Sequence, residues 1–240
     1  MKTLLTLILI ILSLPVWAAD KEGMQINACP KTQMQRDCLQ CHVVGDFRVR
    51  ETAPDAGLVY PNASMRVINS VGYFYLTEID SKGIREFFEY LDLHKIKWAV
   101  IEIHSPGGAL FDGQRIVSYI QAWQAKGGKV ETRLYGMAFS AGFYIFVAGD
   151  HRLVARDADL MWHELQSFEG FGAKITTPSD QEEKTRILRH LQNIRNAYLA
   201  SRCKLSKAEI DNRVSKKEWW MSGADAVKFG FADGYLRGMK

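Results

Sequence analysis

The sequence contains little of what marks several large classes of protein. Its 240 residues include 6 prolines and 19 glycines, with no collagen-like period and no low-complexity tract, so a fibrous or disordered chain is excluded. Four cysteines are too few for a disulfide scaffold, and a chain of this length can bury a core without one. The 31 basic and 27 acidic residues are spread along the chain without long runs, so nothing marks a nucleic-acid-binding surface.

The long apolar run of the sequence lies at its amino terminus. A positive charge at Lys2 precedes an unbroken stretch of Leu, Ile, Thr and Ser over residues 4–14. Val16 and Ala18 then place small residues at the two positions that a signal peptidase recognises. The run is shorter than the roughly 20 residues needed to span a bilayer, which disfavours an uncleaved anchor. We expect residues 1–18 to be a cleaved secretory signal peptide and the mature chain to be periplasmic or secreted.

A polar segment with three of the four cysteines follows at residues 19–64. Within it, Cys38-Leu-Gln-Cys41-His42 matches the attachment signature of a c-type haem, in which two thiols bind the vinyl groups and the histidine ligates iron. The alternative is disulfide pairing, with three connectivities, among Cys29, Cys38, Cys41 and Cys203. A disulfide between Cys38 and Cys41 would exclude the haem.

Hydrophobic residues over residues 65–240 alternate between strand-like and helix-like spacing. The expected strands lie at residues 71–76, 98–103, 130–135, 151–155 and 160–162. The expected helices lie at residues 84–93, 113–123 and 140–148. Because short loops join these elements, the pattern predicts parallel β-α-β units and a single α/β domain with helices packed on its sheet.

The carboxy-terminal part of this domain is expected to be mostly helical. A long helix is indicated by four apolar residues at the spacing of one helix face: Ile187, Leu191, Ile194 and Tyr198. Ser206 followed by Glu209 matches the capping box that starts a helix. Ser222 and Asp225 form a second such pair, and Gly230 suits the end of the helix that they start.

A glycine turn directly follows the expected strand 98–103, in the sequence Ser105-Pro-Gly-Gly108. Two glycines let the backbone turn sharply and leave an N–H pointing outward, which a site needs to bind a developing oxyanion. A turn without chemical function is the alternative for this motif taken alone.

A single hydroxyl among small residues marks a second junction, Gly136-Met-Ala-Phe-Ser140-Ala141-Gly142. A serine at a helix N-terminus lies beside free N–H groups and the positive end of the helix dipole, so an oxyanion is stabilised there. The N–H of Ala141 would supply one donor. An ordinary N-cap serine is the alternative. The segment is not the esterase elbow Gly-x-Ser-x-Gly, because Ala138 stands two residues before the serine.

A serine nucleophile needs a base, most often a histidine, and His163 follows the expected strand 160–162. His104 is the rival because it adjoins the glycine turn, but alternation along its strand favours a position in the wall of the sheet.

Together these segments resemble the ClpP/crotonase superfamily, to which the Clp protease proteolytic subunit belongs. The resemblance extends over residues 71–235, with four blocks in the same order as in the family: His-Ser-Pro-Gly-Gly-Ala, Gly-Met-Ala-Phe-Ser-Ala-Gly, Met-Trp-His, then Trp-Met-Ser-Gly-Ala-Asp. It implies an α/β fold of repeated β-β-α units with a C-terminal helical part. It also implies that Ser140 is the nucleophile, His163 the base, and the N–H groups of Gly108 and Ala141 the oxyanion hole.

The third member of the triad departs from the family pattern. Where the resemblance implies an aspartate before Trp220-Met-Ser222, this chain has Glu218, and Asp211 and Asp225 remain alternatives. Related exported peptidases use a Ser-Lys dyad, for which Lys174 or Lys184 would be available, although the Trp-His block fits the histidine version better.

The sequence therefore predicts an exported serine peptidase that cleaves peptides or unfolded proteins and assembles into a homo-oligomer. Because the chain has a signal peptide and no nucleotide-binding motif, no ATPase partner is expected. The peptidase chemistry requires neither a cofactor nor a metal. The alternative is a non-catalytic binding or assembly protein with the same fold, carrying a c-type haem at Cys38, Cys41 and His42.

Overall fold

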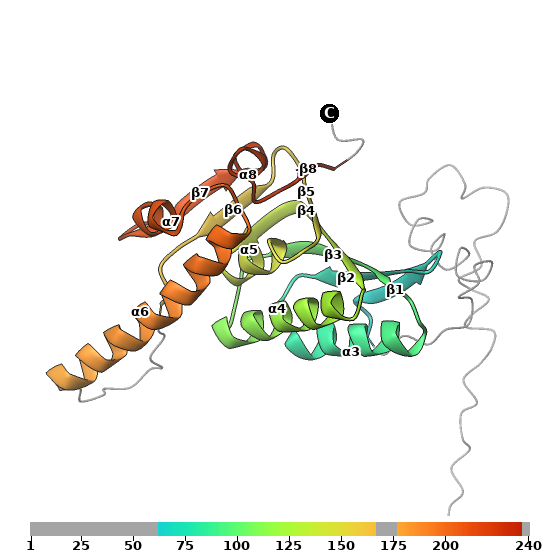
Figure 1. Ribbon diagram of the computed structural model, residues 1–240, viewed down its shortest axis with the longest axis horizontal. Helices are drawn as coiled ribbons and strands as arrows, with labels where there is room; N and C mark the ends of the chain where they lie inside the picture. The colour runs from blue at the N-terminus through green and yellow to red at the C-terminus, as the bar shows by residue number, and fades with distance from the viewer. Residues whose placement is uncertain (1–61, 167–176, 237–240) are drawn as a thin grey trace, which may run out of the picture. The chain divides into compact units, whose positions relative to one another are not determined.

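The computed structural model describes residues 62–166 and 177–236 (Figure 1). The expected signal peptide and the haem-attachment motif lie outside these residues, as does nearly all of the segment 19–64. Both remain predictions from the sequence.

Within the described residues, the strands form one eight-stranded sheet. Its main path runs β1 (Met65–Ile68), β2 (Val71–Leu76), β3 (Trp98–Ser105), β4 (Lys129–Phe139), β5 (His151–Val154) and β8 (Gly234–Tyr235). A branch adds β6 (Asp159–Trp162), which pairs with β4, and β7 (Trp219–Ser222), which pairs with β6. Neighbours from β2 to β8 along the main path are parallel, as the sequence predicted. The hairpin β1–β2 and the antiparallel pair β6–β7, whose strands are far apart in the sequence, are additions that the sequence did not indicate.

The branch in the sheet arises because β4 is long enough to pair twice along one edge. Its first half, residues 131–134, pairs with β5, and its last residues pair with β6. Phe139 at the end of β4 lies opposite Met161 near the end of β6. The chain segments that follow these two strands therefore begin side by side.

The helices are α3 (Ser81–Leu93), α4 (Leu110–Ala125), α5 (Ala141–Phe146), α6 (Pro178–Ser201), α7 (Lys207–Val214) and α8 (Gly223–Phe229). Both predicted capping boxes are confirmed: Ser206 starts α7 and Ser222 starts α8, each with reciprocal side-chain to backbone hydrogen bonds. Gly230 ends α8 at φ 82°, a left-handed conformation that glycine adopts without strain.

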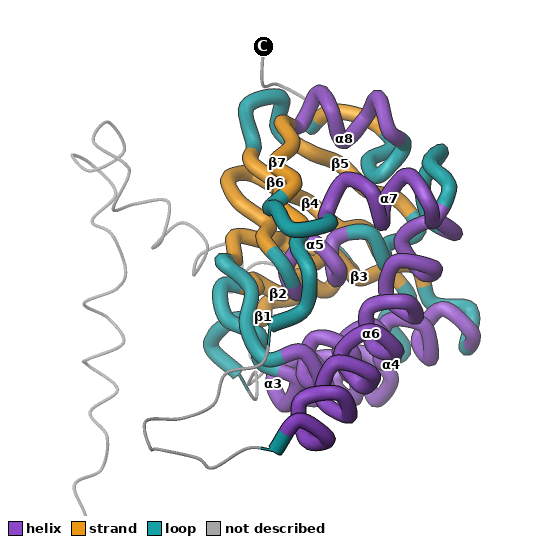
Figure 2. The backbone as a smooth tube through the Cα atoms, turned by 90° about the vertical axis from the view of Figure 1, so that its left-hand side faces the viewer, coloured by secondary structure: helices purple, strands orange, loops and turns teal. Residues whose placement is uncertain are grey.

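The core lies between one face of the sheet and the helices. Phe74, Ile101 and Ile103 are buried on this face, and Gly72 approaches Leu91 of α3 so closely that a side chain there would collide. In Figure 2 the strands gather to the left, with α3, α4 and α6 below and to the right. The arrangement is the mixed α/β architecture that the sequence predicted.

The opposite face of the sheet carries alternating charges. Glu102 on β3 lies 3.8 Å from Arg66 on β1 and 3.9 Å from Arg133 on β4. Arg133 also donates to Glu131 at 2.6 Å, and His151 contacts the other oxygen of that carboxylate at 2.8 Å. Side chains of opposite charge on different strands thus lie beside one another, and this face of the sheet is polar.

Helix α6 buries only part of the face that its apolar spacing indicated: Leu191 and Tyr198 are partly buried, and Tyr198 packs against the core. Arg195, Asn196 and Leu199 are buried, whereas Ile187 and Ile194 remain about half exposed. The helix contacts the rest of the domain through its carboxy-terminal half. No helix among residues 62–166 and 177–236 is both long and apolar enough to cross a membrane.

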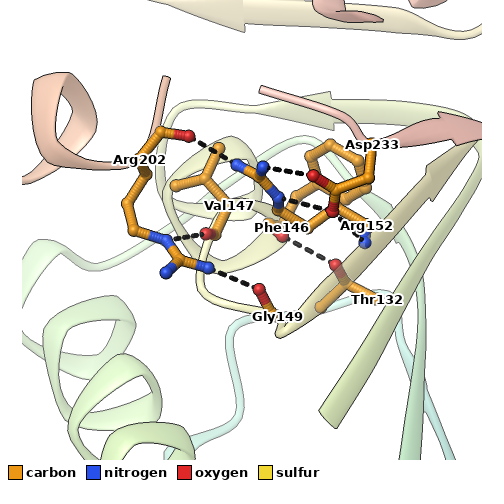
Figure 3. A network of polar contacts seen from close by, with 7 residues as sticks. All are labelled: Thr132, Phe146, Val147, Gly149, Arg152, Arg202 and Asp233. Atoms are coloured by element: carbon orange, nitrogen blue, oxygen red, sulfur yellow. Dashed lines mark hydrogen bonds and ion pairs between the residues drawn. The ribbon is translucent and has the colours of Figure 1, made fainter. Parts of the chain in front are cut away.

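A polar network joins the end of α6 to β5 and to the chain after α8 (Figure 3). Arg152 on β5 donates to both carboxylate oxygens of Asp233, at 3.0 Å and 2.6 Å. It also donates to the carbonyl of Arg202, whose own guanidinium donates to the carbonyls of Val147 and Gly149. These contacts fix the end of α6 against the turn that follows α5.

Candidate active site

Ser140 occupies a strained junction between a strand and a helix. β4 ends at Phe139, α5 begins at Ala141, and Ser140 between them has φ 51° and ψ −116°. A positive φ is unfavourable for a residue with a side chain, and such strain is concentrated at functional sites. Its N–H donates to the carbonyl of Met161 on β6 at 2.9 Å. Its side chain accepts no capping hydrogen bond from α5, so the hydroxyl does not act as an ordinary N-cap.

The glycine turn packs directly against this junction. Gly107 has φ +98°, and a Cβ atom on it would lie 2.7 Å from the carbonyl oxygen of Phe139. The same Cβ would lie 2.9 Å from the Cβ of Ser140 and 3.4 Å from the amide nitrogen of Ala141. Only a residue without a side chain allows the turn to lie this close to the backbone around the hydroxyl.

One pocket of about 440 Å³ contains both predicted catalytic side chains. The described residues that line it are Pro106, Gly108, Ala109, Leu110, Ser140, Ala141, Tyr144, Met161, Trp162, His163, Leu165 and Gln166. Ser140, His163, Gly108 and Ala141 are therefore brought together from three separate parts of the sequence. None of these described lining residues is an aspartate, glutamate, lysine or arginine, so this part of the lining carries no charge when His163 is neutral.

Tyr144 forms part of the wall of this pocket. Its hydroxyl donates to Gln114 on α4 at 3.1 Å, and its ring stacks on Trp162 at an interplanar angle of 18°. Burial raises the pKa of Tyr144 to about 12, so the phenol stays protonated at neutral pH.

The imidazole of His163 contacts a backbone carbonyl. Its Nδ1 lies 2.5 Å from the carbonyl oxygen of Glu164. A carbonyl oxygen only accepts hydrogen bonds, so Nδ1 carries the proton and Nε2 of the neutral ring holds a lone pair. That tautomer is the one in which Nε2 can accept a proton from a serine hydroxyl.

None of the three candidate carboxylates bonds to His163 among the described residues. Glu218 is exposed and accepts a hydrogen bond from the indole of Trp220 at 3.0 Å. Asp225 caps α8 through Ser222. Asp211 accepts from Asn196 at 2.7 Å and from Lys207 at 2.6 Å.

The rival residues lie elsewhere or outside the described part of the chain. His104 lies against Gly136 in the sheet, as a wall residue would, and is not among the pocket-lining residues described. Lys184 is on α6 and is also not among them, while Lys174 lies outside the described residues. Across residues 62–166 and 177–236, no cluster of three or more His, Cys, Asp or Glu side chains is suited to a metal ion.

Sequence reasoning missed two polar residues of α6 that support the site. Gln192 accepts the N–H of Leu165, at the pocket, at 2.6 Å. Asn196 is fully buried and accepts the indole N–H of Trp162 at 2.8 Å. Their spacing of four residues places both on one side of the helix, a signal present in the sequence, but the apolar residues beside them indicate another side as the buried one.

Comparison with known proteins identifies the same region. A model of the Clp protease family matches residues 64–238, which include the glycine turn, the serine junction and the histidine. No curated protein matches the chain significantly.

Proposed function

Because the chain belongs to the Clp protease family over residues 64–238, we propose that it is an exported serine peptidase. The observation that carries the proposal is the pocket shared by Ser140 and His163, in which the serine hydroxyl makes no capping bond. Backbone strain and an imidazole in the base tautomer that lines the same pocket are features expected of an activated serine.

In the proposed reaction, the Oγ of Ser140 attacks the peptide carbonyl while Nε2 of His163 takes the hydroxyl proton. The carbonyl oxygen becomes an oxyanion, which the N–H groups of Gly108 and Ala141 stabilise. When the C–N bond breaks, His163 returns the proton to the leaving amine. Water then attacks the serine ester by the same route and releases the acid.

The residues in the wall of the pocket favour a substrate with an uncharged side chain next to the scissile bond. Leu110, Met161 and Leu165 are apolar, and Tyr144 stays neutral because burial raises its pKa to about 12. The proposed substrates are peptides or unfolded proteins in the periplasm or outside the cell, where the predicted signal peptide would direct the chain. The proposal includes self-assembly, which the family resemblance implies, and no ATPase partner.

A serine-directed fluorophosphonate probe tests the activity of the site. The wild-type protein should be labelled, and Ser140→Ala should abolish labelling. Ser118→Ala is the matched control, because Ser118 is exposed on α4 and its described hydrogen bond is to the carbonyl of Gln114 in the same helix; it should be labelled like wild type. No labelling of wild type, or equal labelling of Ser140→Ala, would reject the peptidase and favour the non-catalytic binding or assembly protein.

Haem attachment at Cys38, Cys41 and His42 stays a separate prediction, and no step of the proposed reaction uses it. Haem absorbance that survives acid-acetone extraction from protein exported with a working maturation system would support it. Loss of that absorbance on extraction would contradict covalent haem attachment.

A further inference from the structure

A continuous row of hydrogen bonds begins at His163. Its Nδ1–H donates to the carbonyl of Glu164, and the N–H of the same peptide group, on Leu165, donates to Oε1 of Gln192 at 2.6 Å. The C=O and N–H of a trans peptide point in opposite directions. By holding the N–H, Gln192 therefore aims the carbonyl of Glu164 at the imidazole.

The row continues along α6 and ends at a carboxylate. Nε2 of Gln192 donates to Oδ1 of Asn196 at 2.9 Å. Nδ2 of Asn196 donates to Oδ1 of Asp211 at 2.7 Å, and Lys207 holds the second oxygen of that carboxylate at 2.6 Å. Three amide groups thus link the imidazole of His163 to a charged side chain on α7.

The direction of each amide follows from its neighbours. The indole of Trp162 only donates, so the Asn196 atom that it contacts is the oxygen. The Asp211 carboxylate only accepts, so the other Asn196 atom is the nitrogen. The N–H of Leu165 fixes Gln192 in the same way. Every amide in the row presents its oxygen toward the imidazole and its N–H toward the carboxylate.

We propose that Asp211 acts on His163 through this row, with Gln192 and Asn196 as positioning residues of the base. The inference rests on the proposed peptidase function. Hydrogen-bonded amides polarise one another, so the charge of Asp211 makes each successive oxygen a better acceptor. The last of these oxygens, on Glu164, stabilises the imidazolium that forms when His163 takes the serine proton.

The row is buried at its centre, at Asn196. Asn196 is fully buried and the Trp162 indole bonded to it is 1% exposed, so water does not compete at this link, whereas His163, Gln192 and Asp211 are partly exposed. Glu218, the acid implied by the family resemblance, is exposed and held by Trp220 instead. Of the three candidate carboxylates, Asp211 is the one that described hydrogen bonds connect to His163.

Rates of fluorophosphonate labelling test the row in the full-length protein. Gln192→Met removes both of its bonds and should lower the labelling rate constant about tenfold or more, because the base loses its orientation. Gln124→Met is the matched control, since it removes one bond to the carbonyl of Ala148 away from the site, and it should label like wild type. Equal rates for Gln192→Met and Gln124→Met would overturn the proposal.

A charge-only substitution isolates the carboxylate. Asp211→Asn keeps an oxygen for Asn196, so it should fold, and should lower the labelling rate constant about threefold by weakening polarisation along the row. Asp92→Asn, at another carboxylate bonded to a lysine, is the control and should leave the rate unchanged. A tenfold loss in Glu218→Gln with no loss in Asp211→Asn would assign the role to Glu218 and overturn the proposal.

Nitrogen NMR of histidine-labelled protein separates failure of this inference from failure of the peptidase. The His163 signal, assigned with His163→Gln, should show the Nδ1–H tautomer in wild type and a mixture in Gln192→Met. This readout does not require activity. If the probe does not label wild type, the proposed peptidase activity is rejected. The tautomer of His163 still tests whether the row of hydrogen bonds orients the imidazole. An Nε2–H tautomer in wild type, or an unchanged signal in Gln192→Met, would overturn it.

Discussion

Gly107 lies so close to Ser140 that a methyl group on the glycine would meet the Cβ of the serine at 2.9 Å. The two residues come from different β-α junctions, after β3 and after β4. Their contact places the glycine turn directly beside the serine and the amide nitrogen of Ala141.

Gly107→Ala should therefore damage both the fold and the site. The new methyl group meets the backbone oxygen of Phe139 at 2.7 Å, and φ +98° is strained for alanine, so a loss of about 2 to 3 kcal/mol in unfolding free energy is expected. Labelling of Ser140 should also fall. Gly127→Ala is the control: it has φ +82° but no atom within 4 Å, so it should lose only about 1 kcal/mol. Equal losses of unfolding free energy in Gly107→Ala and Gly127→Ala, measured by urea unfolding, would contradict the close approach of Gly107 to Ser140.

The strain at Ser140 predicts an unusual order of stability among its substitutions. Ser140→Gly should be more stable than Ser140→Ala by about 1 kcal/mol, because glycine adopts φ 51° without cost and alanine does not. Both variants lack the hydroxyl, so neither should be labelled. Thermal unfolding compares them directly, and an alanine variant as stable as the glycine variant would argue against backbone strain.

The contact between Arg152 and Asp233 predicts a pH-dependent contribution to stability. Burial alone would raise the pKa of the Asp233 carboxyl, but its hydrogen bonds and charge attraction to Arg152 hold that pKa below its ordinary value of 3.8. Asp233→Asn should lose about 2 kcal/mol at pH 7.

This contribution is present above pH 3.8 and is lost as the pH falls through the lowered pKa of the folded state. The gap in melting temperature between wild type and Asp233→Asn should therefore narrow in acid. A gap that stays constant from pH 7 to pH 3 would show that the charge of Asp233 does not carry the effect.

Tyr144 predicts a pH dependence of stability at the alkaline end. Its pKa is raised by burial from 10.0 to about 12, so between these values the unfolded chain loses a proton that the folded chain keeps. Stability should fall as the pH rises through this interval. Tyr144→Phe removes the titrating hydroxyl, so its unfolding free energy, measured in urea, should fall less than that of wild type between pH 10 and pH 11. At neutral pH the variant should be about 1 kcal/mol less stable than wild type, because it lacks the hydrogen bond to Gln114. Parallel pH curves for the two proteins would contradict the prediction.

The parallel centre of the fold was predictable because its signals are local. Strand and helix spacing predicted β2 to β6 and α3 to α5, and the serine pairs predicted the starts of α7 and α8. The expected strand 130–135 stopped short of the end of β4, which continues to Phe139 and pairs with β6 through residues 137–139. β7 was missed because Trp219-Trp-Met-Ser222 carries no alternation of its own and forms a strand only by pairing with β6.

The burial of α6 was not predictable from its apolar spacing, because tertiary contacts decide which face is covered. Asn196 is buried where amide bonds satisfy it, and Ile187 remains exposed because the first half of the helix extends beyond the sheet (Figure 1). The sequence did lead to the residues that share the pocket, but their supports on α6 depend on contacts between distant segments. No local pattern encodes such contacts.

The one-turn separation of Gln192 and Asn196 has a consequence for how the length of α6 can vary. A residue added near Pro178 extends the free end of the helix and leaves both side chains in place. A residue inserted between Gln192 and Asn196 rotates one against the other by about 100° and separates the two amides. The helix can therefore change length freely at its start, whereas its four-residue register beside the pocket has to be kept.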